Sequence, residues 1–405
     1  MIVSCPIDGR TAMSTRAMKT GTSRFRLSRP RKGLRRGGAA AAAAVVAAVM
    51  TAGALAPPAA VAATRPDAVQ QGLNALVRGG QPAALASVED AGGRARTYTA
   101  GVGDLATGAK VPRDGQVRIG SNTKTFTAVV VLQLVGEGKI GLDGWVDTYL
   151  PGVVRGKGLD GGKITVRQLL QHTSGIPDYG ADISDEEMLH RYFEPRDLVD
   201  VALKHGAEFE PGKKWSYSNT NYVLAGLIVQ KVTGRPLAEE IDRRIVRRIG
   251  LRHTYFPGQG DRGIREAHPK GYHRMKKGEP LRDVTRLDPS AGWAAGQMIS
   301  TNSDLNRFFG ELIGGDRLLR EAQRKQMRTT VPIAGTEFHY GLGLMKRPLS
   351  CGGFYWGHGG DITGYETRGG VTDDGRAANV AVTSIPTEAE AVKGVTGVVD
   401  TALCG

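Results

Sequence analysis

The 405-residue sequence is poor in metal-binding motifs and has no long hydrophobic run after its N-terminal region. Its three cysteines form no Cys-x-x-Cys pair, and no His-Glu-x-x-His motif is present. These absences argue against a zinc site, so we expect neither a metal nor another cofactor. No later segment reaches the length of a membrane-spanning helix, which argues against a stable membrane anchor.

The formal net charge of +14 is concentrated at the N-terminus. Residues 1–63 contain ten basic side chains and one acidic side chain, so the rest of the chain carries +5. Beyond residue 63 acids are interspersed with the bases, and no basic block remains that could form a nucleic-acid groove. We therefore expect no nucleic-acid partner.

Residues 1–63 contain the three parts of an export signal. A charged region comes first, then an apolar region rich in alanine and valine, then small residues suited to cleavage. These parts are 29–36, 39–55 and 60–63. We predict a signal peptide over residues 1–63 that is cleaved near Ala62 or Ala63, and a secreted mature protein.

Two cysteines, Cys351 and Cys404, remain after the predicted signal peptide, since Cys5 lies within it. An even pair in an oxidising compartment predicts a disulfide. The alternative interpretation is a pair of buried thiols.

Strand patterns lie near both ends of the exported chain, and helical patterns fill the middle. Alternating residues at 94–100 and apolar runs at 354–356 and 379–382 predict strands. From about 140 to 290 the apolar residues repeat mainly with helical spacing. We predict an α/β fold of the α+β type, with a sheet-containing domain (64–140 and 290–405) and a mainly helical domain (141–289).

Ser121 and Lys124 stand at the start of a long apolar run that predicts a buried helix. Residues three apart share one helical face, so the hydroxyl and the amine can touch. Burial and the positive end of the helix dipole both lower a lysine pKa, and a neutral amine can take a serine proton. The pair is a candidate nucleophile with its own base. The alternative is a serine cap followed by a surface lysine.

Tyr217 and Asn219 form the only Tyr-x-Asn in the sequence and lie just before an apolar helix predicted at 221–233. A tyrosine beside a lysine can pass protons between a serine oxygen and a leaving group. The alternative is a packing tyrosine followed by an asparagine that caps the next helix.

His358 lies in a glycine-rich strand segment, followed by Gly359 and Gly360. Glycines around a strand histidine let a substrate backbone approach closely, and the histidine could steer protons or bind a carboxylate. His339 and Gly341 also fit His-x-Gly. The order of the motifs and the strand-like run that follows favour His358.

Taken in order, Ser121-x-x-Lys124, Tyr217-x-Asn219 and His358-x-Gly360 resemble the motifs of the serine beta-lactamase and DD-peptidase superfamily. The chain is most similar to the secreted actinobacterial D-Ala-D-Ala carboxypeptidases that stand beside the class C beta-lactamases. Matching stretches at 169–176, 210–222 and 340–344 support this, and the resemblance covers about 67–405. It implies an antiparallel sheet flanked by helices plus an all-helical domain, with the site in the cleft between them.

The resemblance also implies an acyl-enzyme mechanism. Ser121 would attack a carbonyl, and Lys124, held neutral, would take the serine proton. Tyr217 would pass a proton to the leaving amine. One donor of the oxyanion hole would be the main-chain N–H of Ser121.

Other residues would hold the substrate. Asn219 would orient the substrate amide, and His358 replaces the lysine that beta-lactamases place in the third motif. Gly359 and Gly360 would lie beside the substrate, and a main-chain N–H near Thr363 would complete the oxyanion hole.

Gly359 is a departure from the resemblance. Carboxypeptidases with histidine in the third motif often follow it with threonine, which helps to hold a substrate carboxylate. Arg347 or Lys346 could supply that contact here. His172 is expected in a structural loop, whereas Tyr179 and Trp293 either line the cleft or pack in the core.

These features predict a D-alanyl-D-alanine carboxypeptidase. We expect it to act as a monomer on peptidoglycan stem peptides or beta-lactams. The alternatives are a class C-like beta-lactamase, a beta-lactamase-fold esterase or a D-amino-acid peptidase. A catalytically idle wall-binding protein is disfavoured by the intact set of Ser121, Lys124, Tyr217 and His358.

Overall fold

The computed structural model describes residues 67–405 except 277, 387 and 388. The predicted signal peptide and its cleavage site lie outside these residues. Within the described part of the chain, every helix is too short or too polar to span a bilayer.

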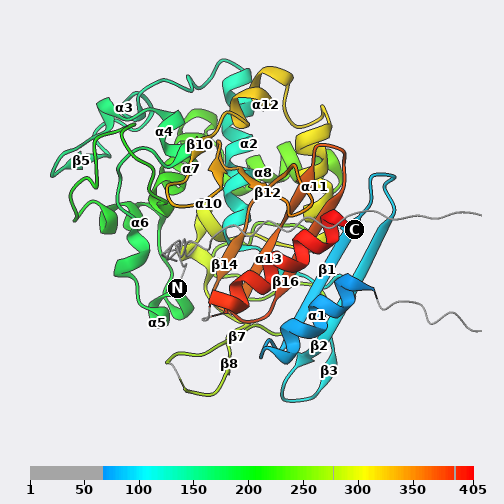
Figure 1. Ribbon diagram of the computed structural model, residues 1–405. Coiled ribbons are helices and arrows are strands. Elements are labelled where there is room, and N and C mark those ends of the chain that lie inside the picture. Colours follow the sequence, from blue (N-terminus) through cyan, green and yellow to red (C-terminus); the bar gives the residue numbers. More distant parts are fainter. Residues whose placement is uncertain (1–66, 277, 387–388) are drawn as a thin grey trace, which may run out of the picture. The chain divides into compact units, whose positions relative to one another are not determined.

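A large antiparallel sheet forms the framework of the described residues (Figure 1). Its strand order is β10-β11-β12-β13-β15-β16-β1-β2-β3, and β14 also pairs with β15. The strands are β1 (Ala83–Glu89), β2 (Ala95–Asp104), β3 (Ala109–Lys110), β10 (Val331–Pro332), β11 (His339–Tyr340), β12 (Met345–Pro348), β13 (Phe354–Gly357), β14 (Gly360–Ile362), β15 (Tyr365–Thr372) and β16 (Ala377–Val382). The two ends of the described part of the chain meet where β1 pairs with β16, as Ser87 stands opposite Asn379. The predicted α/β fold with a sheet built from both ends is confirmed.

The helices fall into two groups along the chain. One group comes from the two ends of the described chain, residues 68–136 and 293–404. It consists of α1 (Ala68–Arg78), α2 (Thr123–Gly136), α10 (Trp293–Gly296), α11 (Asn302–Gly314), α12 (Glu321–Met327) and α13 (Ala389–Cys404). The middle of the chain forms α3 (Val146–Tyr149), α4 (Val166–Gln171), α5 (Asp185–His190), α6 (Pro195–Ala202), α7 (Asn219–Thr233), α8 (Leu237–Ile241) and α9 (Arg247–Ile249). Three small ladders pair β4 (Val117–Arg118) with β9 (Ile299–Ser300), β5 (Arg155–Gly156) with β6 (Leu159–Asp160), and β7 (Tyr272–His273) with β8 (Arg282–Asp283).

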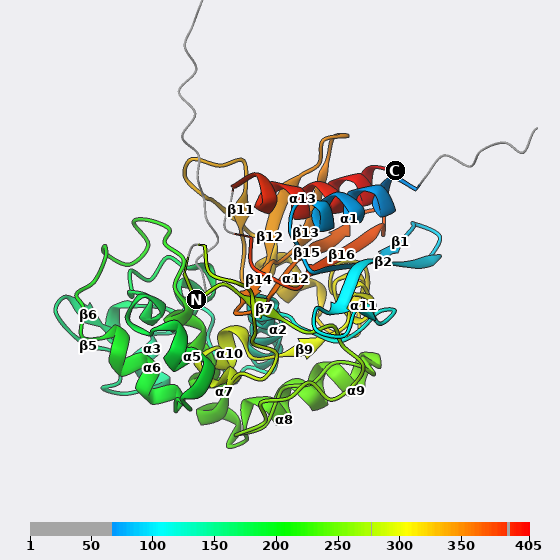
Figure 2. The same ribbon diagram turned by 90° about the horizontal axis from the view of Figure 1, so that it is seen from below.

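Helices cover both faces of the sheet (Figure 2). On one face α1 and α13 lie side by side, because Val69, Leu73 and Leu76 recur at helical spacing and form one apolar stripe. On the other face α11 packs against β1, β15 and β16. The predicted boundaries at 140 and 290 stay a prediction, since one apolar core includes residues from both predicted domains.

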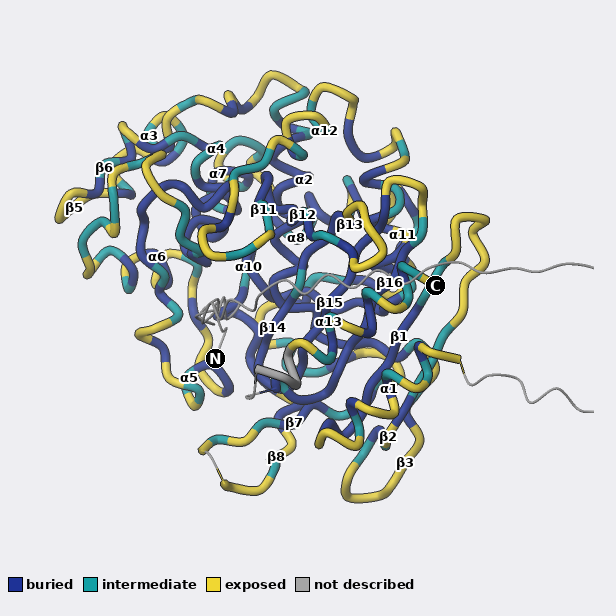
Figure 3. The backbone as a smooth tube through the Cα atoms, viewed as in Figure 1, coloured by how far each residue is buried: buried dark blue, intermediate teal, exposed yellow. Residues whose placement is uncertain are grey.

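The helix α2 is the centre of this core (Figure 3). Every residue from Thr123 to Leu132 is buried, and Phe126 stacks on Phe308 of α11 with ring centroids 3.8 Å apart. A helix that is buried around its whole circumference needs partners on every side. The helices α7, α10 and α12 supply them. The side chains of its first turn are therefore held by packing rather than by a loop.

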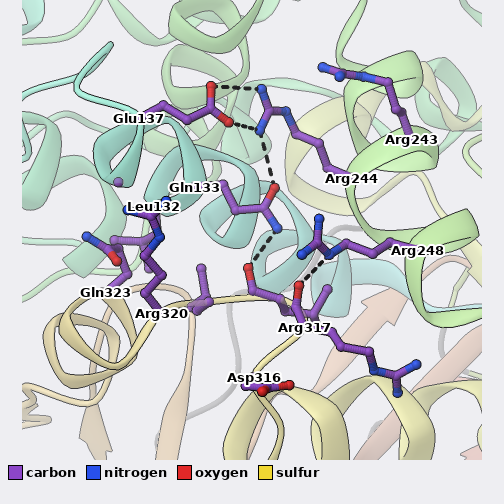
Figure 4. Close-up of a pocket in the computed structure, with 13 residues that line it drawn as sticks. Leu132, Gln133, Glu137, Arg243, Arg244, Arg248, Asp316, Arg317, Arg320 and Gln323 are labelled. Carbon is purple, nitrogen blue, oxygen red and sulfur yellow. Dashed lines mark hydrogen bonds and ion pairs between the residues drawn. The ribbon is translucent and has the colours of Figure 1, made fainter.

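The far end of α2 lines an arginine-rich cavity of about 430 Å³ (Figure 4). Arg244 donates to both carboxylate oxygens of Glu137, which directly follows α2. Gln133 donates to the carbonyl of Leu318 at 2.8 Å. These contacts tie the last turn of α2 to the α8–α9 stretch and to the segment before α12. The helix is thus fixed at both ends.

Cys351 and Cys404 are joined by a disulfide, with their Cα atoms 5.7 Å apart. The bond links the turn between β12 and β13 to the end of α13.

Replacing both cysteines with serine should destabilise the protein. The bond separates residues 53 apart in the sequence, so the chain-entropy model predicts a loss of about 4 kcal/mol in the free energy of unfolding. Urea denaturation of the Cys351→Ser/Cys404→Ser variant against the oxidised protein measures this loss. Reductant should destabilise the unsubstituted protein and leave the variant unchanged. Equal stability of the two proteins would show that the bond does not constrain the unfolded chain.

Candidate active site

Ser121 lies in a 3₁₀ turn (Gly120–Asn122) that leads directly into α2. Gly120 has φ +46°, a conformation that residues with side chains rarely adopt. A Cβ at Gly120 would lie 2.8 Å from the main-chain nitrogen of Asp361 in β14. The glycine therefore lets β14 approach the main chain of the candidate nucleophile.

Lys124 is fully buried, and its Nζ contacts three oxygen atoms. The distances are 2.9 Å to Ser121 Oγ, 2.7 Å to Asn219 Oδ1 and 2.8 Å to the carbonyl oxygen of Ala295. A neutral amine has two N–H groups and one lone pair. The amide and carbonyl oxygens can only accept, so they take both N–H groups and the Ser121 hydroxyl must donate to the lone pair. A neutral Lys124 therefore orients the Ser121 proton toward itself.

The buried environment favours this neutral form. Burial lowers the pKa of Lys124 to about 7, whereas the charges of Asp178 and Asp361 act in the opposite direction. The surface-lysine alternative does not fit this position, because the amine has no access to solvent.

Tyr217 lies next to this amine, on the extended stretch that leads into α7. Lys124 Nζ is 4.8 Å from the centre of the Tyr217 ring. The same ring is 4.3 Å from the His172 ring and 6.4 Å from the His358 ring. The structure thus brings residues of all three sequence motifs together around Lys124.

His358 is buried between β13 and β14 and has one defined tautomer. Its Nδ1 lies 2.6 Å from the carbonyl oxygen of Gly359, which can only accept, so Nδ1 carries the proton. Its Nε2, 2.9 Å from the hydroxyl of Tyr340, therefore accepts. Burial, followed by the nearby charge of Lys124, lowers the pKa of His358 to about 3. The neutral ring carries no positive charge that would attract a substrate carboxylate, so the carboxylate-binding role expected of His358 stays a prediction.

His172 closes an aromatic cluster behind Tyr217. It terminates α4 in the left-handed conformation and is fully buried. The main-chain N–H of Ser218 donates to its Nδ1 at 3.2 Å, so the stretch carrying Tyr217 is hydrogen-bonded to it. Burial holds the pKa of His172 well below its usual value. This arrangement fits the structural loop expected from the sequence.

The register of β14 identifies a second candidate oxyanion donor. Ile362 stands opposite Tyr365, and Asp361 stands opposite Glu366. In an antiparallel hairpin, hydrogen-bonded residue pairs alternate with pairs that are not hydrogen-bonded to each other. The pair that flanks a two-residue turn is hydrogen-bonded, so the N–H and C=O groups of the next pair point away from the partner strand. The N–H of Asp361 therefore points away from β15. Gly120 lies on that side, against the main chain of Asp361.

This register corrects the expectation for Thr363. Thr363 and Gly364 form the turn between β14 and β15, and Thr363 lies beside Met188 and Pro289. The register instead favours Asp361, two residues earlier in the chain, as the candidate for this donor. The strand β14 begins only two residues after His358 and ends at Ile362, so the chain already turns at Thr363.

Asn219 has both ends of its amide occupied. Its Oδ1 accepts from Lys124, and its Nδ2 donates to Asp178 Oδ2 at 2.9 Å. The amide nitrogen carries a second N–H, so the substrate-orienting role expected of Asn219 stays a prediction. Sequence reasoning missed Asp178. The available signal was a lone carboxylate in the otherwise apolar stretch 176–179.

Gly359 and Gly360 are both sites of close approach. A Cβ at Gly360 would lie 1.9 Å from the carbonyl oxygen of Ile119, so only glycine fits beside the strand that leads to Ser121. A Cβ at Gly359 would lie 3.0 Å from Nη1 of Arg368. That guanidinium is buried and paired with Asp361 at 2.7 Å.

Arg347 lies on β12, with its guanidinium 4.7 Å from the centre of the Phe338 ring. The side chain is buried, and its charge is close enough to contribute to the lowered pKa of His358. Arg347 thus lies near the third motif, and its contact with a substrate carboxylate stays a prediction.

Of the remaining candidates, Tyr179 lies in the core and the partly buried Trp293 packs against it. Tyr179 is fully buried and donates to the carbonyl of Ala291. Trp293 packs against Gly226 of α7, where a Cβ would lie 2.8 Å from its ring. Among the described residues, no group of three or more histidine, cysteine, aspartate or glutamate side chains could hold a metal ion.

A comparison with models of protein families shows which family the chain belongs to. The model described as Beta-lactamase matches residues 39–402. The chain belongs to the beta-lactamase family. It is a hydrolase of the serine beta-lactamase fold, and the site around Ser121 is the candidate active site of that fold.

Two curated relatives match part of the chain. Penicillin-binding protein 4* of Bacillus subtilis is 29% identical over 262 residues, which cover 62% of this chain and 56% of that protein. Protein flp of Staphylococcus aureus strain MW2 is 31% identical over 157 residues, 38% of this chain and 31% of flp. The chain thus spans little more than half the length of the first relative and about a third of the second.

Two solved structures match at greater coverage. A D-stereospecific amidohydrolase from Streptomyces sp. is 43% identical with a TM-score of 0.73, covering 78% of this chain and 93% of that chain. D-amino acid amidase from Ochrobactrum anthropi SV3 is 28% identical with a TM-score of 0.72, covering 83% of this chain and 96% of that chain.

The reactivity of Ser121 should depend on the protonation of Lys124. Below about pH 7 the amine is protonated and cannot take the serine proton, so phosphonylation of Ser121 by a fluorophosphonate should slow as the pH falls through that value. Labelling rates from about pH 5 to about pH 9 measure this. The Lys124→Arg variant, charged throughout this range, should react about 10²- to 10⁴-fold more slowly. A rate independent of pH would exclude Lys124 as the base.

Proposed function

We propose that this protein is a secreted serine amidohydrolase that forms an acyl-enzyme on Ser121 and hydrolyses amides or short peptides of D-amino acids. The hydrolytic part of the proposal rests on the three oxygens around the Lys124 amine. In the neutral amine two of them take the N–H groups, so the lone pair is left for the Ser121 hydroxyl. The substrate class is supported by the similarity to the D-stereospecific amidohydrolase, of which 93% is covered.

The environment of Gly359 favours this function over a strict carboxypeptidase. A carboxypeptidase must hold the terminal carboxylate of its substrate, and Gly359 offers no hydroxyl for that purpose. The adjacent cation, Arg368, is also committed elsewhere: it pairs with Asp361 at 2.7 Å and with Glu366 at 2.9 Å. An amide of a D-amino acid has no carboxylate on its leaving group and needs no such contact.

In the proposed reaction Lys124 takes the Ser121 proton as the serine oxygen attacks the substrate carbonyl. The negative charge that develops on the carbonyl oxygen is stabilised by the N–H groups of Ser121 and Asp361. The proton then passes by way of Tyr217 to the leaving nitrogen, which departs as ammonia or an amine. Water attacks the ester on Ser121, releases the D-amino acid and restores the hydroxyl.

A D-alanyl-D-alanine carboxypeptidase is the second candidate. The similarity to penicillin-binding protein 4* supports it, with peptidoglycan stem peptides or beta-lactams as ligands. In this case Arg347 is the cation that would meet the substrate carboxylate. Secretion and a monomeric state are parts of both proposals.

A substrate panel distinguishes the two functions. The panel contains D-phenylalaninamide, L-phenylalaninamide, a peptide ending in D-Ala-D-Ala and nitrocefin, each with the protein and with Ser121→Ala. We expect the highest kcat/KM for the D-amide and none above background for Ser121→Ala. Faster release of D-alanine from the peptide would favour the carboxypeptidase. Turnover of the D-amide that persists in Ser121→Ala would overturn the mechanism.

Tyr217→Phe should separate amides from activated esters. Loss of a proton donor lowers kcat for an amide by about 10²- to 10⁴-fold, because an amine leaves only after protonation. A p-nitrophenyl ester of the same D-amino acid should lose much less, since p-nitrophenolate leaves unprotonated. The exposed Tyr192 provides the matched control, Tyr192→Phe. Equal losses on both substrates would assign Tyr217 to packing.

A further inference from the structure

We propose that Asp178 is a positioning residue for Lys124: it fixes the orientation of the Asn219 amide and thereby holds the Lys124 amine toward Ser121. This inference rests on the proposed function, because it concerns activation of the same serine. It adds to the site the loop at 177–180, which lies on the side of Asn219 away from Lys124.

The orientation of Asn219 is the first step of the argument. An asparagine amide can present either its oxygen or its nitrogen to a neighbour. A carboxylate can only accept, so Asp178 Oδ2, 2.9 Å from the amide nitrogen, selects the orientation in which Nδ2 faces Asp178. The opposite end, Oδ1, must then face Lys124 Nζ at 2.7 Å. Without Asp178 the amide could turn and present N–H groups to the amine.

The second step is that Asp178 is itself held in place. Its other oxygen, Oδ1, accepts from the main-chain N–H of Gly180 at 2.9 Å. The loop is also tied to the first turn of α7, where Thr220 Oγ1 donates to the carbonyl of Pro177 at 2.7 Å and accepts from the N–H of Tyr179 at 3.2 Å. The loop at 177–180 and the start of α7 therefore form one hydrogen-bonded unit.

The third step concerns the orientation of the serine proton. The lone pair of Lys124 faces Ser121 only while both N–H groups are taken by Ala295 and Asn219. If the Asn219 amide turns, one N–H loses its acceptor and can be donated to Ser121 Oγ instead. The serine proton then points elsewhere, and the base is misaligned without any loss of the lysine itself.

The charge of Asp178 predicts in which direction its replacement should move the pKa of Lys124. The titratable groups around Lys124 are Asp178 after α4, Asp361 of β14, His172 after α4, His358 after β13, Tyr217 before α7 and Tyr222 of α7. Of these only Asp178 and Asp361 raise the pKa of Lys124. Replacing Asp178 by a neutral residue should therefore lower this pKa and shift the acid limb of reactivity to lower pH.

The experiment compares Asp178→Asn and Asp178→Ser with the unsubstituted protein. The serine variant keeps an acceptor for Gly180 N–H and so preserves the turn if the asparagine variant folds poorly. Fluorophosphonate labelling of Ser121 should slow by about 10- to 100-fold at its plateau, while its acid limb moves to lower pH. A carbon-13 NMR titration of Lys124 should show the same downward shift and does not depend on any activity. The control is Asp182→Asn in the same segment, which should change neither quantity.

A double-mutant cycle tests whether Asp178 acts through Asn219. In the Asn219→Ala background, Asp178→Asn should slow labelling no further, because the amide that Asp178 orients is absent. Additive losses, or an unchanged Lys124 titration and labelling rate in both Asp178 variants, would overturn the inference.

The fluorophosphonate has no amino group, and this separates the inference from two other outcomes. If Asp178 bound a substrate ammonium instead, its variants would raise KM for D-amino-acid amides and leave labelling unchanged, which would also overturn the inference. If the protein labels at Ser121 but hydrolyses no D-amide, the proposed substrate class fails while the role of Asp178 is still measured.

Discussion

The burial of a single amine organises the site. Lys124 lies inside the core, where a charged ammonium is costly and a neutral amine must still satisfy its N–H groups. The carbonyl of Ala295 in α10 and the amide oxygen of Asn219 in α7 accept from these N–H groups, and the hydroxyl of Ser121 meets the remaining lone pair. The same arrangement that satisfies the buried amine also directs the serine proton. Stability and reactivity therefore depend on the same three contacts.

Close approach of main chains is the second constraint. The turn carrying Ser121 and the strand β14 come so near that Gly120 and Gly360 have no room for a Cβ. Two N–H groups from segments far apart in the sequence can then face one carbonyl oxygen. Gly360 of the third motif follows from this packing, independently of any contact it makes with a substrate.

The sequence was informative where chemistry and local periodicity coincide. Ser121 and Lys124 could be paired because a spacing of three places them on one helical face, and the apolar run behind them predicted burial. The sheet formed by both chain ends followed from the distribution of strand and helix patterns. Thr363 was misplaced, because strand register depends on where a turn closes and a shift of two residues is invisible in a glycine-rich stretch. Asp178 was missed because its role exists only through a contact with Asn219, which a linear pattern does not contain.

The pairing of β1 with β16 has a consequence for how the protein becomes competent. Ser121 follows β1, whereas Asp361 and His358 precede β16, and the two strands join residues such as Ala84 and Val382 from opposite ends of the chain. Contacts of such large sequence separation are slow to form, because a long loop must close first. We therefore expect the pairing of β1 with β16 to be a late step of folding. On this expectation, a chain whose last strands have not yet been made holds Ser121 without the segment that carries Asp361 and His358.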